Sequence, residues 1–298
     1  MRTTKRFTPK VLARFEKQGR GTGTHQEYIG WHRVTRGDPA SRGRSHLLHW
    51  RGRLIDLLSD GELGEQLFAT MLPSLEDSLE QFMLAPEDSP HPLAAYLEPG
   101  SGELFPGTLR LAAELGIRHP MVHGEDEPVP WVMTTDLLLV FFEPGQGRAM
   151  LAIAFKPKGW ETKRRTKALL RLEREYWVRR GVQWLLITPD LYDRSVVLTL
   201  RRIAAWAIAE PVSPRVRRLA RDIAMDNPFA SVEHLLRLIE AHCPSLHVAQ
   251  CALWQGVWCG EIPVRLTRSW RPHLPLEHIS TEEFVAQNPI AARRSSWT

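Results

Sequence analysis

The most distinct pattern of the chain is a pair of apolar runs separated by a turn signal. The runs are Val132–Phe142 and Met150–Phe155, and Pro and Gly dominate residues 144–147 between them. Runs so rich in β-branched, aromatic and aliphatic residues are typical of strands buried on both faces. The pattern therefore predicts a buried β-hairpin, in which Asp136 and Lys156 are charges that such strands do not normally hold.

The two charges can be aligned by counting back from the turn, which we expect to be formed by residues 144–147. Asp136 then lies opposite Phe155, one step from Lys156. A one-residue bulge would bring the carboxylate and the ammonium to one face. The pair is either a structural ion pair of the core or the centre of a metal-dependent nuclease, in which the aspartate holds Mg²⁺ and the lysine orients or deprotonates water.

Patterns on either side of the hairpin predict further elements of an α/β core. These are a short capped helix after Thr8, a helix from Ser59 to Leu72, a strand at Glu80–Leu84, a helix at Thr108–Leu115, a helix at Lys163–Arg180 and a strand at Val182–Thr188. Glu62 stands three residues after Ser59, so a helix capping box is enough to explain it. Glu173 lies within the apolar stripe of its helix, where a carboxylate is costly unless it is paired or bound to metal or solvent.

Beyond Pro189 the pattern becomes mainly helical. The predicted helices are Val196–Ile208, Arg215–Met225, Val232–His242 and Leu246–Trp254. A hairpin is predicted at Val257–Leu266, and helix, turn, helix, hairpin is a winged-helix pattern. The tail from Glu277 is expected to be loose. We therefore expect two domains, residues 1–189 and residues 190–298.

Length and composition are those of an ordinary globular protein, with 298 residues, 43% hydrophobic and 24% charged. No apolar stretch is long enough to span a membrane, and the N-terminus has no apolar segment of a signal peptide. The chain has only 3 cysteines. This favours a reducing compartment, and we expect a cytoplasmic protein.

The distribution of charge is uneven along the chain. Residues 1–53 hold 13 Lys and Arg against 3 acids, residues 54–109 hold 11 acids and no Lys or Arg, and residues 156–180 hold 10 Lys and Arg against 3 acids. Two basic blocks around an acidic one fit a protein that grips phosphates and gathers carboxylates at a metal centre. Solvated surfaces would give the same distribution.

Eight motifs in one order resemble the TnsA family, the endonuclease subunits of heteromeric cut-and-paste transposons. The resemblance covers roughly Gly19 to Trp206, and the C-terminal third shares only length and helical character. The motifs are RGTG at Arg20–Gly23, SRGRSH at Ser41–His46, LLSDGE at Leu57–Glu62, EQF at Glu80–Phe82, LAAELGIRHP at Leu111–Pro120, VMTTD at Val132–Asp136, LAIAFKP at Leu151–Pro157 and RTKALLRLEREYW at Arg165–Trp177.

The resemblance implies a restriction-endonuclease-like domain, a mixed sheet flanked by helices. The catalytic positions of the family fall on Glu62, Asp136 and Lys156, and a further acidic position falls on Glu173. One residue departs from the pattern. The best-known member has Gln two residues before the lysine and many related nucleases have Glu, whereas this chain has Ala154.

Such a site would use Mg²⁺, with two ions and with Mn²⁺ as a possible substitute. Asp136 and Glu62 would bind the metal together with the backbone carbonyl of Phe155, and Lys156 would hold or activate the attacking water. Ala154 and Glu173 would lie just behind these ligands. The side chains expected on DNA phosphates are Arg42, Arg44, Lys163, Arg164, Lys167 and Arg171.

The resemblance therefore implies a Mg²⁺-dependent endonuclease that cuts the 5′ strands at transposon ends. Its partners would be transposon-end DNA, a DDE transposase (TnsB-like) that cuts and joins the 3′ strands, and an AAA+ regulator (TnsC-like). Ala154 keeps open the alternative of a catalytically impaired architectural subunit that holds DNA and partners. A third alternative is a restriction-type nuclease that cuts without partners.

Overall fold

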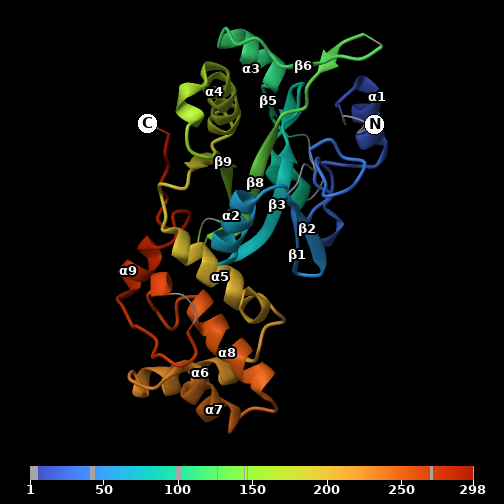
Figure 1. Cartoon of the computed structure of the whole chain (residues 1–298). Coiled ribbons are helices and arrows are strands. Elements are labelled where there is room, and N and C mark those ends of the chain that lie inside the picture. The colour runs from blue at the N-terminus through green and yellow to red at the C-terminus, as the bar shows by residue number, and fades with distance from the viewer. Residues whose placement is uncertain are drawn as a thin grey trace, which may run out of the picture. The chain divides into compact units, whose positions relative to one another are not determined.

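The computed structural model describes residues 6–40, 44–97, 102–125, 127–143, 145, 147–268 and 271–297. The chain forms two compact units (Figure 1). The first contains Met1–Leu63, Ser74–Ile187 and Trp297–Thr298, and the second contains Gly64–Pro73 and Thr188–Ser296. A separation near residue 189 was expected from sequence, but the assignment of Gly64–Pro73 to the second unit was not. None of the described helices combines the length and the apolar character needed to cross a membrane.

A four-stranded mixed sheet forms the core of the first unit, in the order β10–β9–β8–β3. Its strands are β3 (Leu75–Met83), β8 (Thr134–Glu143), β9 (Gly147–Phe155) and β10 (Gln183–Ile187). β8 is antiparallel to both of its neighbours, whereas β10 runs parallel to β9. The predicted hairpin is confirmed as β8–β9, and its central residues are fully buried. The mixed sheet flanked by helices is the expected architecture.

The register of the hairpin differs from the expectation by one residue. Glu143 pairs with Gly147, and Leu137 pairs with Ile153. The pairs of this hairpin end at Leu137–Ile153, and the next residue, Asp136, accepts a hydrogen bond from the backbone N–H of Phe155. Thr135 and Leu138 both face α4, the first through Glu173 and the second through the apolar cluster. The alternation of side chains along β8 is therefore interrupted beside Asp136, as a bulge would do.

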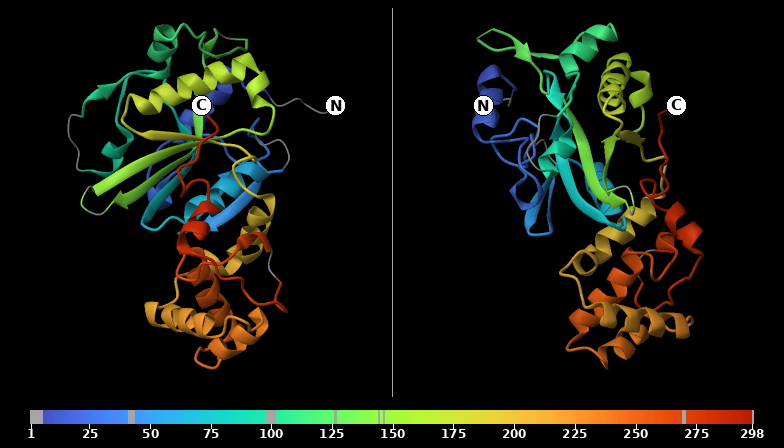
Figure 2. Two further views of the ribbon diagram at one scale, coloured as in Figure 1. Left: turned by 90° about the vertical axis from the view of Figure 1, so that its left-hand side faces the viewer. Right: turned by 180° about the vertical axis from the view of Figure 1, so that it is seen from behind.

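Helices cover one face of this sheet, and a second hairpin lies on the other (Figures 1 and 2). α3 (Thr108–Glu114) and α4 (Arg164–Val178) pack on the first face through a cluster that includes Leu111, Leu170 and Trp177. On the opposite side lie α1 (Pro9–Lys17), β1 (His46–Trp50) and β2 (Arg53–Leu57). The helices predicted from Thr108 and from Lys163 are thus confirmed within a few residues.

The remaining elements of the first unit are short, apart from α2. α2 runs over Asp60–Thr70, and its first turn belongs to the first unit. The others are two-residue strands and single turns of 3-10 helix. They are η1 (His25–Glu27), β4 (Ser89–Pro90), η2 (Pro92–Tyr96), β5 (Leu104–Phe105), β6 (Met121–Val122), β7 (Val129–Pro130) and η3 (Trp160–Thr162).

The second unit is mainly helical, as predicted. Its elements are α5 (Arg194–Ala207), α6 (Pro214–Asp226), α7 (Val232–Glu240), α8 (Leu246–Trp258), η4 (Leu266–Arg268) and α9 (Thr281–Ala286). α8 packs against α5, α6 and α7, which explains why its residues from Cys251 to Trp258 are all buried. Serine or aspartate side chains cap α5, α6, α7, α8 and α9.

Two expectations for this unit were wrong. Val257–Leu266 does not form a hairpin, because the apolar run of α8 continues to Trp258 and the helix stops only before Gly260, whose φ is +77°. The tail after Glu277 is also ordered. Ser280 and Glu283 form a reciprocal capping box for α9, and Ile290 is fully buried.

Candidate active site

The paired charges of the hairpin meet where β8 begins and β9 ends. Oδ2 of Asp136 accepts a hydrogen bond of 2.7 Å from the backbone N–H of Phe155 and lies 3.6 Å from Nζ of Lys156. Nζ of Lys156 also donates to the carbonyl of Phe155 at 2.6 Å. The side chains of Asp136 and Lys156 are 18% and 29% exposed, so the pair is partly open to solvent.

Glu62 joins the cluster from the first turn of α2. It caps its own helix, because its N–H donates to Oγ of Ser59 at 3.2 Å and its carboxylate accepts from Ser59 and from the N–H of Leu58. The same carboxylate faces the sheet, where Oε2 accepts a hydrogen bond of 3.1 Å from Nε2 of Gln81. Capping therefore does not keep Glu62 from facing the candidate site.

Gln81 is a site residue that the sequence analysis missed. Its Nε2 donates to Glu62 and, at 3.4 Å, to Oδ1 of Asp136, while its Oε1 accepts from Oγ1 of Thr134 at 3.2 Å. Its backbone is left-handed, with φ of +47°, a conformation that few side-chain-bearing residues adopt. The only sequence signal was an amide within the apolar strand motif EQF.

The carboxylates of Glu62 and Asp136 make the site ready for a cation. Burial, and then the charge of Asp136, raises the pKa of Glu62 from 4.5 to about 7. The amide of Gln81 donates to both carboxylates but carries no charge, and the ammonium of Lys156 is paired with Asp136. A bound cation would allow both to ionise.

Glu173 lies behind the site on α4 and is hydrogen-bonded despite its apolar surroundings. Its Oε1 accepts from Oγ1 of Thr135 at 2.9 Å and from Nε1 of Trp184 at 3.2 Å. Burial raises the pKa of Glu173 to about 7, against the opposing effect of the Lys156 charge. Thr135 precedes Asp136, so this network fixes the backbone that carries the aspartate.

Ala154 precedes Phe155, whose backbone N–H donates to Asp136. It is fully buried and pairs in register with Leu186 of β10. It belongs to the apolar cluster that also contains Leu170 and Trp184. A longer side chain at this position would share a strand face with Lys156 but would need space that the core now fills.

The donor set of the site fits Mg²⁺. The carboxylates of Glu62 and Asp136 and the carbonyl of Phe155 are hard oxygen ligands, and Mg²⁺ is commonly held by one or two carboxylates plus water and phosphate. Nζ of Lys156 already places a positive charge against that carbonyl and Asp136. Within the described ranges, no group of three or more His, Cys, Asp or Glu side chains could hold a metal ion. A backbone carbonyl and water would therefore have to complete the coordination.

The side chains expected on DNA lie mostly at the start of α4. Lys163, Arg164, Lys167 and Arg171 are all exposed, and the last three follow helical spacing along one side. The side chain of Arg44 is 87% exposed, and its Nη1 lies 3.3 Å from Oδ2 of Asp60. Arg42 lies outside the described residues.

A groove of about 400 Å³ opens beside Lys156 and Glu173. We call it the Trp131 groove. Its other lining residues are Pro120, Met121, Trp131, Met133, Thr134, Thr166, Leu169 and Leu170. The groove is mostly apolar, yet both charged residues that line it belong to the candidate active site or to the network behind it.

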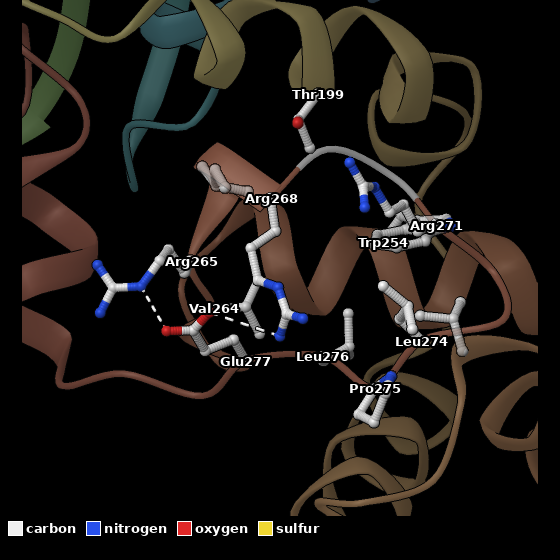
Figure 3. A pocket seen from close by; sticks show the side chains of 12 residues that line it. Thr199, Trp254, Val264, Arg265, Arg268, Arg271, Leu274, Pro275, Leu276 and Glu277 are labelled. Atoms are coloured by element: carbon white, nitrogen blue, oxygen red, sulfur yellow. Dashed lines mark hydrogen bonds and ion pairs between the residues drawn. The ribbon is translucent and has the colours of Figure 1, made fainter.

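The second unit has a smaller cavity, of about 40 Å³ (Figure 3). Nε1 of Trp254 and Oγ1 of Thr199 line it and have no hydrogen-bond partner among the residues that the structure describes. Arg265 and Arg268 lie at the cavity and both pair with Glu277. The volume suits a few ordered waters, which would satisfy the two buried donors.

Comparison with known proteins gives two matches. Residues 96–189 match the family described as TnsA-like endonuclease N terminal. The chain is 34% identical over 202 residues to the transposon Tn7 transposition protein TnsA of Escherichia coli. The aligned part makes up 67% of this chain and 63% of that relative, so the chain spans less than two thirds of the relative's length.

Proposed function

Because the chain belongs to the TnsA family, we propose that it is the nuclease subunit of a transposase and hydrolyses the 5′ (non-transferred) strands at transposon ends. The observation that carries this proposal is the convergence of Glu62, Asp136 and Lys156 from three separate elements. Gln81 and the backbone of Phe155 connect them by hydrogen bonds. The reaction is cut-and-paste transposition, in which donor DNA is released by cutting both strands.

Glu62, Asp136 and the carbonyl of Phe155 would hold Mg²⁺, or Mn²⁺ in its place. When bound, two such ions supply the positive charge that a phosphodiester needs for hydrolysis. Lys156 is held 3.6 Å from Asp136, where its ammonium can orient a water molecule and neutralise a phosphate oxygen. Glu173 supports Asp136 through Thr135 and keeps the strand end in place.

DNA would lie along the exposed basic side of α4. Lys163, Arg164, Lys167 and Arg171 would bind phosphates, with Arg44 and Arg42 as further contacts. Each phosphate contact releases counterions, so binding is expected to weaken with salt. α4 begins eight residues after Lys156, so the side chains that would bind phosphates are close in sequence to the candidate active site.

The partners would be a DDE transposase that processes the 3′ strands and an AAA+ regulator that licenses both activities. We assign partner binding to the C-terminal part, residues 190–298. This part is mainly helical and has the near-balanced charge, 13 Lys and Arg against 11 Asp and Glu from residue 190 onward, that suits a protein surface better than bare DNA.

One observation favours a second candidate function, a catalytically impaired architectural subunit. Ala154 lacks the polar side chain that related nucleases carry at this position, and it is packed in the core. Glu62, Asp136 and Lys156 remain. Mg²⁺ usually retains several waters, so a water molecule can take the place of the missing side chain.

A protein that binds DNA and partners yet cuts at no Mg²⁺ or Mn²⁺ concentration would favour the architectural role. Cutting by the purified chain without partners would instead favour a restriction-type nuclease.

The proposal predicts a change of transposition product when Asp136 is replaced. Without 5′ cuts, 3′-end joining alone leaves the donor attached, so Asp136→Ala should give cointegrates in place of simple insertions. Insertion products are scored by counting donor-marker retention in a mating-out assay. Glu161→Ala, which removes an exposed carboxylate outside the cluster, is the matched control and should leave simple insertions unchanged. Simple insertions at normal frequency from Asp136→Ala would refute the assignment.

A further inference from the structure

The Trp131 groove is a cavity that hydrolysis of a phosphodiester does not by itself require. It is bounded by Met121 of β6, by Met133 and Thr134 at the start of β8, and by Leu169 of α4. Its volume of about 400 Å³ lies within the range of pockets that hold small organic groups. Because Lys156 lines it, whatever occupies the groove lies directly beside the reacting phosphate.

The ring of Trp131 is held in a fixed orientation. The imidazole of His32 stacks against it, with centroids 5.6 Å apart and planes inclined by 22°. The ring of Phe7 meets it edge-on at 4.6 Å. The backbone N–H of Trp131 donates to the carbonyl of Pro120 at 2.9 Å. His32 is itself buried and uncharged, since burial lowers its pKa to about 4. The indole is therefore a rigid aromatic platform that is already backed on one side.

Polar groups lie at the edge of the groove opposite its apolar walls. Thr134 and Thr166 provide hydroxyls. Oε1 of Glu173 accepts from Thr135 and Trp184, whereas Oε2 accepts no hydrogen bond from the described residues. A carboxyl whose pKa is about 7 can donate or accept near neutral pH. Base edges present both acceptors and donors, so this edge complements them.

A flat aromatic group satisfies these features better than the alternatives. A phosphate or a sugar would leave its polar atoms against Met121, Met133 and Leu169, which is costly. An apolar side chain of a partner protein would fill the walls but would offer no hydrogen bond to Oε2 of Glu173. A base satisfies both, and it is attached by one nucleotide unit to the phosphate that Lys156 would contact.

We propose that the Trp131 groove takes one unpaired nucleobase of the strand being cut, the base next to the scissile phosphate, which stacks on Trp131. This inference rests on the proposed nuclease function. The base must leave the duplex, so the pocket favours cut sites where pairing is weak. The stacked base would also fix the position of the phosphate between Asp136 and Lys156, which makes Trp131 a positioning residue.

The test is a double-mutant cycle between Trp131 and the base. The 5′ cut is first mapped in the complete reaction with transposase, regulator and Mg²⁺. Single-turnover cutting is then measured for the natural protein and Trp131→Leu, on natural DNA and on DNA with an abasic nucleotide on either side of the cut. Trp131→Leu should slow cutting of natural DNA about tenfold, the effect of losing one stacked base. On DNA that lacks the base in question, the two proteins should cut equally fast.

Three further arms make the result decisive. Trp131→Phe keeps an aromatic ring and should recover most of the rate on natural DNA. Trp160→Leu removes a half-buried tryptophan that stacks on Trp297 outside the groove, and its effect should not depend on the abasic nucleotide. An abasic nucleotide in the uncut strand should leave the Trp131→Leu defect in place.

Equal slowing by Trp131→Leu on natural and abasic DNA would overturn the inference, and so would no slowing at all. A defect that changes with regulator concentration and not with the base would show that the groove binds a protein side chain, which also overturns it. Asp136→Ala run alongside separates the two proposals. Loss of cutting in Asp136→Ala with no coupling at Trp131 refutes the groove assignment alone, whereas normal cutting in Asp136→Ala refutes the nuclease site.

Discussion

At the scale of single residues, Gln81 links the two carboxylates of the site through one amide. Removing it takes one hydrogen bond from Glu62 and one from Asp136. The two carboxylates would then repel each other more strongly and would be less well oriented. Groups that orient metal ligands typically change metal affinity by about 10- to 100-fold. We expect Gln81→Ala to shift the Mg²⁺ dependence of cutting to higher concentration by that factor, with the same cut position.

The measurement is a Mg²⁺ titration of cutting in the complete reaction. Gln18→Ala is a matched control, because Gln18 also accepts one side-chain hydrogen bond, from Arg20, in the first unit but does not contact the site. An unchanged midpoint for Gln81→Ala would show that the amide has only a structural role.

Glu173 gives a prediction for the pH dependence of stability. Its pKa is raised from 4.5 to about 7, so the folded protein holds this proton more tightly than the unfolded chain does. The stabilisation is complete below pH 4.5 and is lost as pH rises through 7. At 1.36 kcal/mol per pKa unit, the free energy of unfolding should fall by roughly 3 kcal/mol. Glu62 acts with the same sign, whereas the lowered pKa of His32 acts with the opposite sign between pH 4 and 6.5.

The contribution of Glu173 is isolated by comparison with Glu173→Gln. Gln keeps an oxygen for Thr135 and Trp184 but cannot ionise. Chemical denaturation without metal should show the natural protein losing stability relative to the variant between pH 5 and pH 8. Parallel stability curves over this range would mean that Glu173 does not carry the raised pKa.

At the scale of elements, the close approach of α2 to the end of β9 depends on Gly61. A Cβ at this position would come within 2.2 Å of the ring of Phe155. Ala favours a helix over Gly by about 1 kcal/mol, but here it would push the first turn, with Glu62, away from Asp136. We expect Gly61→Ala to reduce cutting by more than tenfold while the protein stays folded.

Gly64 provides the matched control within the same helix. A Cβ on Gly64 would meet Val197 at an ordinary 3.4 Å, so Gly64→Ala should gain the same helix propensity without loss of cutting. Both variants are assayed for cutting and for thermal unfolding. Full activity of Gly61→Ala would show that Phe155 can move aside and that the spacing of Glu62 is not critical.

The basic side of α4 gives a second prediction at this scale. Arg164 and Lys167 are exposed one turn apart, and each phosphate contact contributes about 0.9 to the slope of log affinity against log salt. Replacing both by Ala should lower that slope by about 2 in a fluorescence-anisotropy titration with DNA. Arg179→Ala, which removes an arginine already paired with Glu175 at the other end of α4, should leave the slope unchanged. An unchanged slope in the double variant would place these residues on a solvated surface.

The order of elements in the first unit was predictable because the hydrophobic periodicity of its sequence is clear. The exact alignment of the hairpin was not predictable. The loop holds one residue fewer than the turn signal suggested, since Gly147 pairs with Glu143. The pairs of β8 and β9 up to Leu137–Ile153 are therefore shifted by one residue. Gln81 escaped prediction for a similar reason. Its left-handed backbone and its hydrogen bonds to Glu62, Asp136 and Thr134 depend on residues far away in the sequence.

At the scale of the whole molecule, the chain contacts itself in a way that local patterns could not reveal. The apolar stripe of α2 predicted a buried helix but not its surroundings. Within the second unit, the ring of Phe68 packs against Tyr192, and the carbonyl of Phe68 accepts a hydrogen bond of 2.8 Å from Asn288. A chain ending at Asp190 would lose these contacts and expose apolar residues of α2. Partner binding by the C-terminal part is therefore best tested on the full chain.

The central test also concerns the whole molecule, because we expect cutting only in the complete reaction with the partner proteins. Primer extension on both strands of a transposon end, in the complete reaction with Mg²⁺, maps every cut for the natural protein and for Asp136→Ala. The account predicts that the variant loses the 5′-strand cuts and keeps the 3′-strand cuts made by its partner. Persistence of the 5′-strand cuts at their normal rate and position in Asp136→Ala would contradict it.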